Sequence, residues 1–190
     1  MMQDGKALQM GTSHNLGQHF AKVFDVKFIG EDKQDHFVWQ TSWGITTRLI
    51  GAMVMIHGDD KGLVMPPKVA PTQVVIVPIP FKGLDAEAIA SKTKEISETL
   101  KTHGVSVILD DRNEYTPGWK FHQWELKGIP IRIELGPRDL KQSQVVMVRR
   151  DTGQKTPVNE ADILSTVNKL LEEIQDNMFA KAKASLQDKT

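Results

Sequence analysis

The stretch Val74-Val-Ile-Val-Pro78 decides the fold class of the larger part of this chain. A continuous apolar run of this length is typical of a strand that is buried on both faces of a sheet. Apolar residues at helical spacing follow it up to Gly104, and a second strand-like run covers residues 105–109. Strands that alternate with helices indicate right-handed crossovers and a three-layer α/β domain.

The remaining downstream sequence continues this alternation. We expect a short helix, two strands and a long final helix, in that order, over residues 119–126, 129–135, 144–148 and 163–178. The final helix carries its apolar residues on one face, from Ile163 to Met178. Residues 74–190 are therefore predicted to form one α/β domain of ordinary size.

Turn and proline signals separate this domain from the residues upstream. Gly58-Asp-Asp-Lys-Gly62 is typical of a turn, and three prolines between residues 66 and 71 break helices and favour extended chain. The upstream part is predicted to contain a strand, a helix, a hairpin and a second strand, over residues 6–9, 16–24, 30–33 and 37–42. The predicted division is an N-terminal part, a linker and a C-terminal domain, over residues 1–66, 67–73 and 74–190.

The N-terminal part contains a candidate anion site in the stretch Thr41-Ser-Trp-Gly-Ile-Thr-Thr-Arg48. This stretch joins a strand-like run to a helix whose apolar face includes Leu49 and Met53. Gly44 allows a ligand to approach the backbone closely. Arg48 can pair with phosphate oxygens in a bidentate manner, and its charge adds to the positive field of the helix N-terminus. From the residues alone, this is an anion site beside a small apolar pocket.

The C-terminal domain contains a candidate site for unpaired bases. Asp110-Asp-Arg112 and Gly136-Pro-Arg138-Asp139 each follow a predicted strand directly, and ligands favour the carboxyl ends of strands in open α/β sheets. A predicted helix lies between these two segments, and Phe121 and Glu125 share one of its faces. Aromatic rings stack on single-stranded bases, carboxylates accept hydrogen bonds from guanine, and guanidinium groups bind base edges or phosphates. We therefore expect these groups to gather at one edge of the sheet.

Structural alternatives exist for several nearby residues. Glu125 and Lys127 can form a solvated helix face, and Arg132 with Glu134 can be a strand ion pair of little energetic worth. Trp119 and Trp124 can serve core or hinge packing, and Arg149-Arg150 can be an exposed strand end. The residues by themselves leave each structural role open beside the functional one.

Composition and charge exclude several classes of protein. Hydrophobic residues make up 39% of the chain and charged residues 25%, which is close to the globular average. No apolar run approaches the roughly 18 residues of a membrane span, and no signal peptide is visible. The chain has no cysteine, which excludes disulfides and thiolate metal sites. The formal net charge is +0, so any contact with nucleic acid must come from locally placed basic groups.

Four stretches of the chain resemble class II aminoacyl-tRNA synthetases, in the form of the prolyl-tRNA synthetases of the eukaryote/archaeon-like type. Thr41 to Arg48 is similar to motif 3 of this class, and Leu8 to Lys22 is similar to the strand-loop-helix that lines the proline and adenosine pockets. Val69 to Ile79 resembles the passage into the anticodon-binding domain, and Thr116 to Asp139 resembles the recognition surface of that domain. The four stretches follow the family order over nearly the whole chain.

The resemblance implies a partial class II catalytic fold, with an antiparallel sheet plus helices, followed by a three-layer α/β anticodon-binding domain with a mixed five-stranded sheet. Motif 1, motif 2 and the C-terminal zinc-binding-like domain of the family have no counterpart in the sequence. We therefore expect an internal fragment of a longer enzyme, with Met1-Met2 as an artificial or misassigned start.

The resemblance also implies functional residues. Those expected to bind ATP are Gln9, Thr12, Thr46 and Arg48. Those expected to bind proline are His14, Ser42, Trp43 and Gly44. Those expected to read the anticodon are Phe121, Glu125, Arg132, Arg138 and Asp139. The sequence contains no complete catalytic set and no spacing of metal or zinc ligands.

The implied reaction is that of a proline–tRNA ligase, which activates L-proline with ATP and Mg²⁺ and transfers it to tRNA(Pro). The whole enzyme is expected to be a cytoplasmic homodimer without a membrane partner, and a multi-synthetase complex is a further expected partner. This chain alone is expected to be inactive, because the motif-2 Arg for the α-phosphate is missing. The alternatives are a non-catalytic tRNA-binding accessory protein, against which the intact Thr46 and Arg48 argue, and a scaffold module of a multi-synthetase assembly.

Overall fold

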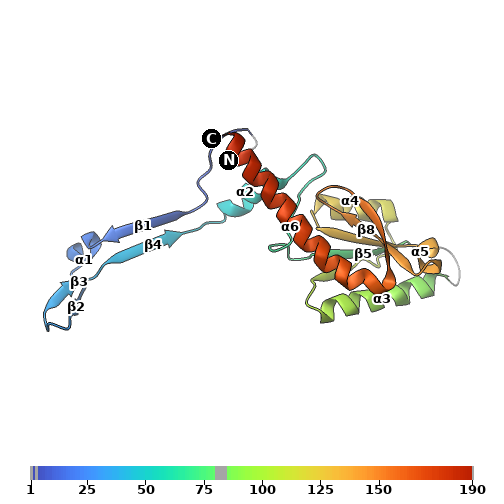
Figure 1. Ribbon diagram of the computed structural model, residues 1–190, viewed down its shortest axis with the longest axis horizontal. Coiled ribbons are helices and arrows are strands. Elements are labelled where there is room, and N and C mark those ends of the chain that lie inside the picture. Colours follow the sequence, from blue (N-terminus) through green and yellow to red (C-terminus); the bar gives the residue numbers. More distant parts are fainter. Residues whose placement is uncertain (1, 3, 80–84, 190) are drawn as a thin grey trace. The chain divides into compact units, whose positions relative to one another are not determined.

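Two compact units make up the chain, Met1–Met55 and Ile56–Thr190. The computed structural model describes residues 2, 4–79 and 85–189, and Figure 1 shows their helices and strands. The division falls within helix α2 (Arg48–His57), upstream of the proline-rich stretch. Residues 56–73 therefore group with the residues that follow them.

The first unit contains two antiparallel strand pairs. β1 (Thr12–Gly17) pairs with β4 (Gln40–Gly44), and β2 (Lys27–Ile29) pairs with β3 (Asp35–Phe37). The second pair confirms the predicted hairpin. Helix α1 (His19–Val23) is shorter than predicted, because residues 12–17 form a strand instead. The strand predicted over residues 6–9 is wrong, since these residues pair with no strand of the described chain.

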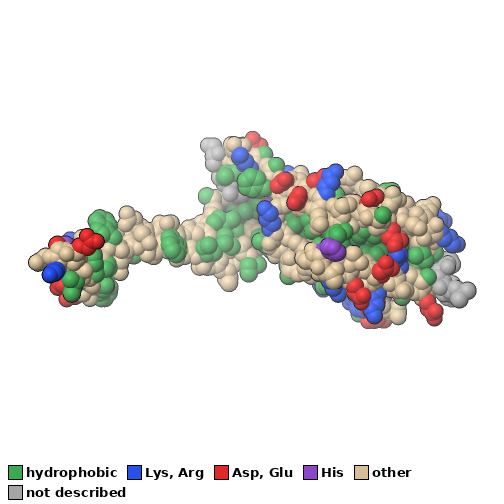
Figure 2. All heavy atoms as spheres, turned by 60° about the horizontal axis from the view of Figure 1, so that its bottom comes forward, with side chains coloured by type: hydrophobic (Ala, Val, Ile, Leu, Met, Phe, Trp, Pro, Cys, Tyr) green, Lys and Arg blue, Asp and Glu red, His purple; other side chains and the backbone are tan. Residues whose placement is uncertain are grey.

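The first unit buries little apolar surface. Among its described residues, only Ala21 and Ala52 are buried hydrophobic side chains. Trp39 and Trp43 are 74% and 81% exposed, and Figure 2 shows further hydrophobic side chains on the surface of this unit. A two-stranded ribbon has no second layer to cover its faces, so its large side chains stay in contact with solvent.

A mixed five-stranded sheet forms the centre of the second unit, as predicted, with the order β6-β5-β7-β8-β9 (Figure 1). Its strands, in chain order, are β5 (Val74–Pro78), β6 (Val107–Leu109), β7 (Ile131–Leu135), β8 (Gln144–Arg149) and β9 (Lys155–Asn159). β5 is parallel to β6 and β7, whereas β8 is antiparallel to β7 and β9. The first four residues of β5 are all buried, which confirms the prediction of a strand covered on both faces.

Helices cover the two faces of this sheet unequally. α3 (Asp85–Thr102) and α6 (Ile163–Asp188) pack on one face, over a large apolar cluster from β5, β7 and β8. α4 (Pro117–Leu126) packs on the other face, against Val75 and Val77 of β5. These three layers confirm the predicted α/β class. None of the described helices combines the length and the apolar character that crossing a bilayer requires.

Strand β7 presents different chemistry to the two faces of the sheet. Ile131, Ile133 and Leu135 belong to the large apolar cluster. Because side chains alternate along a strand, Arg132 and Glu134 point to the opposite face, which is the face of α4. The charged positions of β7 therefore share a face with the helix that the sequence linked to base recognition.

In the second unit, the sequence analysis predicted neither the short helix after β7 nor the edge strand after β8. α5 (Pro137–Lys141) has only five residues, and the edge strand β9 contains Pro157. A proline within a strand-like run argues against a strand, and so it hides an edge strand of this kind. A short 3₁₀ helix (Glu160–Asp162) follows β9 and leads into α6.

Candidate nucleic-acid interface

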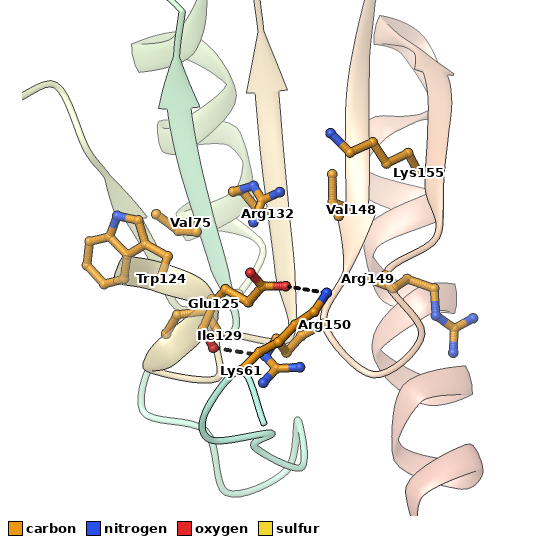
Figure 3. A pocket seen from close by; sticks show the side chains of 11 residues that line it. Lys61, Val75, Trp124, Glu125, Ile129, Arg132, Val148, Arg149, Arg150 and Lys155 are labelled. Atoms are coloured by element: carbon orange, nitrogen blue, oxygen red, sulfur yellow. Dashed lines mark hydrogen bonds and ion pairs between the residues drawn. The ribbon is translucent and has the colours of Figure 1, made fainter. Parts of the chain in front are cut away.

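A charged hollow of about 160 Å³ lies beside α4, toward the amino ends of β5 and β7 (Figure 3). It is bordered by α4, by the sheet, by the β8–β9 turn and by the segment that precedes β5. The charged side chains of this basic hollow are Lys61, Glu125, Arg132, Arg149, Arg150 and Lys155. All of them except Glu125 are cationic, and each cation has a carboxylate partner. The pairs are Lys61 with Glu125, Arg132 and Lys155 with Glu134, Arg149 with Asp151 and Glu173, and Arg150 with Asp59.

Arg132 of β7 lies over an aromatic ring of α4. Its guanidinium carbon is 4.5 Å from the centroid of the Phe121 ring. Its Nε and Nη2 atoms donate hydrogen bonds to Glu134 Oε1, at 3.0 and 2.8 Å. The strand ion pair considered from the sequence is therefore present, and it fixes the guanidinium beside the ring.

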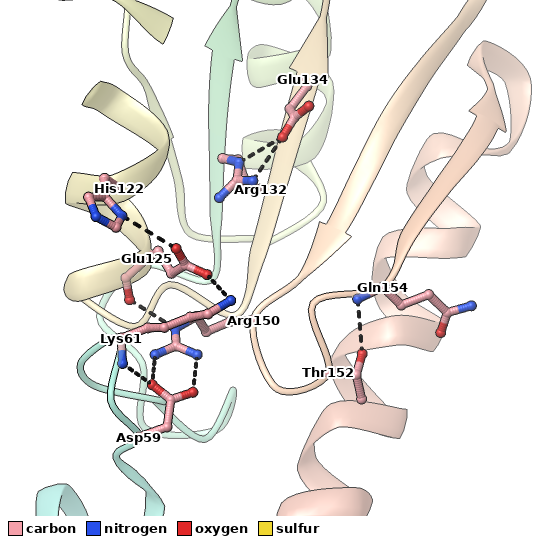
Figure 4. A network of polar contacts seen from close by, with 9 residues as sticks. All are labelled: Asp59, Lys61, His122, Glu125, Arg132, Glu134, Arg150, Thr152 and Gln154. Carbon is pink, nitrogen blue, oxygen red and sulfur yellow. Dashed lines mark hydrogen bonds and ion pairs between the residues drawn. The ribbon is translucent and has the colours of Figure 1, made fainter. Parts of the chain in front are cut away.

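Glu125 lies near the C-terminal end of α4, between two side chains that can carry positive charge. Lys61 Nζ is 3.3 Å from Glu125 Oε1, and His122 Nδ1 is 3.6 Å from Glu125 Oε2 (Figure 4). The Glu125 side chain is 24% exposed, so it is not the fully solvated group of the structural alternative. A carboxylate in this position can accept hydrogen bonds from the N1–H and N2–H₂ groups of guanine.

The structure does not bring Arg138 and Asp139 to the basic hollow. Both lie in α5, which follows the carboxyl end of β7, whereas Arg132 lies near the amino end. Asp139 Oδ2 accepts a hydrogen bond from Gly136 N at 3.0 Å, so it caps α5, and Arg138 is exposed. The prediction that the charged and aromatic groups gather at one edge of the sheet is therefore confirmed only in part. β6 and β7 are both parallel to β5, so Asp110–Arg112 and Arg138–Asp139 follow strands that end at the same edge, whereas Glu125 and Arg132 lie toward the opposite edge.

Asp110 belongs to a buried polar cluster of the fold. Its carboxylate accepts hydrogen bonds from Arg112 Nε, Arg112 Nη2 and Trp124 Nε1, each at 2.7 Å, and Lys120 Nζ donates to its carbonyl at 3.0 Å. Burial alone would raise the pKa of Asp110, but the hydrogen bonds from Arg112 and Trp124 and the charge of Lys120 outweigh burial and lower this pKa to about 2. The carboxylate of Asp110 and the guanidinium of Arg112 are therefore hydrogen-bonded to each other rather than directed to a ligand.

The two tryptophans of α4 lie in different surroundings. Trp124 is buried in the apolar cluster beneath α4, as the packing alternative described. Trp119 stacks on Tyr115, with ring centroids 3.9 Å apart, and stays 43% exposed. Trp119 is therefore accessible from solvent, whereas Trp124 supports the wall of the basic hollow.

In the first unit, strand pairing brings part of the expected proline site together. His14 Nδ1 is 3.1 Å from Ser42 Oγ, and Thr12 lies opposite Gly44 across the β1–β4 pair. Because successive side chains point to opposite faces, Trp43 lies on the other face of the ribbon. The structure therefore groups His14 with Ser42 and does not bring Trp43 to them.

The expected ATP residues of the first unit also come together in part. Arg48 Nη1 donates to the carbonyl oxygen and to the side-chain oxygen of Gln9, each at 3.4 Å. Thr46 Oγ1 accepts a hydrogen bond from Arg48 N at 3.3 Å. Thr12, the fourth expected residue, lies at the start of β1.

Sequence reasoning missed two cations of the basic hollow, Lys61 and Lys155. Lys61 lies in the turn that precedes β5, and Lys155 starts the edge strand that was not predicted. For the Arg149-Arg150 pair, an exposed strand end was the main interpretation and a phosphate contact the alternative. The adjacent arginines were the one sequence signal for the cations of the hollow. A lysine in a turn belongs to no periodic pattern and gives no such signal.

The mixed sheet and the helices on both of its faces define a three-layer α/β domain with a charged hollow beside α4. Residues 73–172 match the family model described as the anticodon binding domain, and the chain belongs to that family. The matched residues run from the start of β5 into α6, and they contain every charged residue of the basic hollow except Lys61.

Curated relatives named proline–tRNA ligase match almost the whole chain. One from Natranaerobius thermophilus is 52% identical over 190 residues, which are 100% of this chain and 39% of the relative. One from Symbiobacterium thermophilum is 54% identical over 184 residues, 96% of this chain and 37% of the relative. One from Cenarchaeum symbiosum is 50% identical over 186 residues, 98% of this chain and 39% of the relative. These matches confirm the resemblance to prolyl-tRNA synthetases, and the chain spans about two fifths of the length of these relatives.

Proposed function

We propose that this chain supplies the anticodon-reading domain, and part of the ATP and proline site, of a proline–tRNA ligase. The observation that carries the proposal is the basic hollow, which Glu125 and Arg132 both line, with Arg132 lying over the ring of Phe121, within the matched family domain. The family of the domain and the names of the relatives support tRNA(Pro) as its ligand.

Glu125 and Arg132 of the hollow, and Phe121 beside Arg132, each have a role in this proposal. Phe121 offers an aromatic surface on which an unpaired base stacks, and Glu125 accepts hydrogen bonds from the Watson–Crick edge of guanine. Arg132 donates to guanine O6 and N7 or to a phosphate. Arg138 and Asp139, at the other end of β7, contact another part of the same RNA loop.

An RNA stem-loop that carries the proline anticodon tests this proposal. Its affinity for the 190-residue chain is compared with that of the same stem-loop in which adenine replaces the anticodon guanines. We expect each replacement to weaken binding by about 1–3 kcal/mol, because the carboxylate and guanidinium groups lose their partners. Equal affinity for both RNAs would contradict a reading role of the hollow.

The first unit supports the second half of the proposal. Arg48 is held beside Gln9 at the start of α2, where its charge can bind a terminal phosphate of ATP, and Thr12 and Thr46 are the other proposed ATP contacts. Mg²⁺ is proposed to enter with the ATP phosphates. No group of three His, Asp or Glu side chains in the described part of the chain could hold a metal ion by itself.

The proline site is proposed on the same ribbon. His14 and Ser42, which share one face of the β1–β4 pair, offer hydrogen bonds to the edge of the substrate. Gly44 allows the substrate to approach the backbone, and Trp43 is retained as a proposed apolar wall. Trp43 can contact proline only if the chain that carries it bends toward the face of His14.

For the whole protein we propose activation of L-proline followed by its transfer to tRNA(Pro), in a cytoplasmic homodimer. The proline carboxylate attacks the α-phosphate of ATP, and pyrophosphate leaves. Such a reaction depends on the positioning of the reactants and on stabilisation of developing negative charge. Arg48 supplies one of the cations that this step needs. The intact contact between Arg48 and Gln9 also argues against a purely accessory tRNA-binding protein.

A further inference from the structure

A strap docked on the end of α4 forms one wall of the basic hollow. The strap, Asp59–Met65, precedes β5 and lies outside the residues matched by the family model. Leu63 N donates to Leu126 O at 3.0 Å, and Met65 N donates to Gly128 O at 3.1 Å. The strap is therefore bonded through its backbone to the residues that end α4.

Two glycines allow the strap to lie this close to the helix. Gly62 has a φ of +126°, and a Cβ at this position would lie 2.6 Å from Leu126 O. Gly128 has a φ of +73°, and its Cβ would collide with the carbonyl of Leu63. Side chains other than hydrogen are excluded by both the backbone conformation and the available space. The contact is thus a specific fit between two backbone segments.

A buried arginine joins the strap to the helix end (Figure 4). Arg150 donates from Nη1 and Nη2 to the two carboxylate oxygens of Asp59, at 2.7 and 2.6 Å, and from Nε to Glu125 O at 2.8 Å. A buried guanidinium that loses its partner is costly, so Asp59 is needed to neutralise it. The hydrogen bonds from Arg150 lower the pKa of Asp59 to about 2, which keeps it anionic near neutral pH.

This arrangement controls the surroundings of the Glu125 carboxylate. Arg150 binds the carbonyl oxygen of Glu125 and the carboxylate of Asp59, so the position of the residue that carries the Glu125 side chain depends on this ion pair. Asp59 accepts hydrogen bonds from both terminal nitrogens of Arg150 and thereby holds the guanidinium against the end of α4. Lys61, which is exposed in the same strap, leaves its ammonium group 3.3 Å from Glu125 Oε1 at the rim of the hollow.

We propose that the strap is a functional part of the RNA site, in which Asp59 positions Glu125 through Arg150 and Lys61 contacts a backbone phosphate of the bound loop. The inference rests on the proposed function, since it assumes that Glu125 reads guanine. It assigns specificity to residues that precede the matched anticodon-binding domain. Asp59 is a positioning residue, whereas Lys61 touches the ligand.

Guanine and inosine in the anticodon of the stem-loop RNA separate base reading from phosphate binding. Inosine lacks the N2 amino group that donates to Glu125, so the affinity ratio of the two RNAs measures this contact. We expect a ratio of about tenfold or more for the unchanged 190-residue chain, as for other hydrogen bonds to charged groups. Asp59→Asn should bring the ratio close to one, because the guanine RNA loses two hydrogen bonds to Glu125 whereas the inosine RNA, which keeps only the N1–H donor, loses one.

Two further variants complete the experiment. Asp60→Asn removes the same charge from the neighbouring exposed residue of the strap, and it should leave the guanine-to-inosine ratio unchanged. Lys61→Gln should weaken binding of both RNAs and reduce the slope of log affinity against log salt by about one, as expected for one lost phosphate contact.

The outcomes distinguish the two proposals. A ratio of one for the unchanged chain contradicts the proposed reading role of Glu125. A normal ratio that persists in a folded Asp59→Asn variant overturns the positioning role of the strap and leaves the proposed function intact. If circular dichroism shows that Asp59→Asn does not fold, Lys61→Gln decides, and an unchanged salt slope then overturns the inference.

Discussion

Trp124 Nε1 donates a hydrogen bond to Asp110 Oδ2 at 2.7 Å, and so α4 is bonded to the residue that follows β6. The same indole packs in the apolar cluster beneath α4 and lines the basic hollow. The side chain that forms this wall of the hollow is therefore held in place by the buried Asp110 carboxylate, which has several hydrogen-bond donors. Changes in that cluster should affect the stability of the second unit more than the chemistry of the hollow.

Replacement of Trp124 by Phe should reveal the energetic value of this hydrogen bond. The variant leaves Asp110 buried with one donor fewer, which should lower the free energy of unfolding by about 1–3 kcal/mol. Urea denaturation measures the change. Trp119→Phe is the matched control, because Trp119 is exposed and a phenyl ring can still stack on Tyr115; its effect should stay within about 0.5 kcal/mol. Equal losses in both variants would contradict a special role of the Trp124 donor.

Acid should destabilise the second unit in a defined pH range. The pKa values of Asp59 and Asp110 are lowered from 3.8 to about 2 in the folded protein, so the unfolded chain binds protons more readily. Their contribution to stability is complete above a pH of about 4 and is lost as the pH falls toward 2. For Asp110, whose side chain is fully buried, this contribution is on the order of 2 kcal/mol.

Urea denaturation at a series of pH values measures this effect. An Asp110→Asn variant should be less stable than the unchanged chain near neutral pH, and its stability should vary less with pH in the acidic range. The same acid dependence in both proteins would mean that other carboxylates cause it.

Arg138 should affect base preference from its place at the other end of β7. We expect Arg138→Ala to weaken binding of the anticodon stem-loop by about 1–3 kcal/mol and to relax discrimination among bases. Lys141→Ala removes a nearby exposed cation of the same helix and should lower affinity evenly across sequences. Losses that are equal and independent of sequence for both variants would argue against reading by Arg138.

Limited proteolysis should leave the docked strap uncleaved. The backbone of residues 59–65 is bonded to the end of α4, so it resists the local unfolding that a protease needs. The first unit buries little apolar surface and should be digested first. Mass spectrometry should identify a resistant product that begins near Ile56. Early cleavage between Asp59 and Met65 would show that the strap is not stably docked.

The 190-residue chain should not activate proline by itself. The sequence has no counterpart of motif 2, whose arginine binds the α-phosphate, and loss of one such charge donor typically costs a factor of about 10²–10³ in rate. Proline-dependent exchange of pyrophosphate into ATP should therefore stay at background with the purified chain. Exchange above background that disappears in an Arg48→Ala variant would refute this expectation.

The sequence was informative where local pattern and tertiary structure agree. The apolar run of β5 and the helical spacing of α3 and α6 were sufficient to predict a three-layer α/β domain with these elements. The sequence did not show which of Arg132 and Arg138, at opposite ends of β7, lies beside the basic hollow. Chain order alone does not reveal at which end of a strand a ligand binds. The resemblance grouped these two arginines by family role, and the structure separates them by the length of one strand.

The docking of the strap could not be predicted from the sequence either. Gly58 to Gly62 carries a turn signal, and the prolines that follow were interpreted as a linker. The partner that holds Asp59 is Arg150, which lies far along the chain, and no local pattern connects them. Long-range pairing of single charged residues is invisible to periodicity.

The proline in β9 also affects how copies of this protein behave when they are crowded together. β9 is one outer strand of the sheet, and Pro157 at its centre has no amide proton to offer to an incoming strand. The opposite outer strand, β6, has only three residues. Neither border of the sheet can template a long run of intermolecular hydrogen bonds, which protects the folded domain from growth into cross-β fibrils.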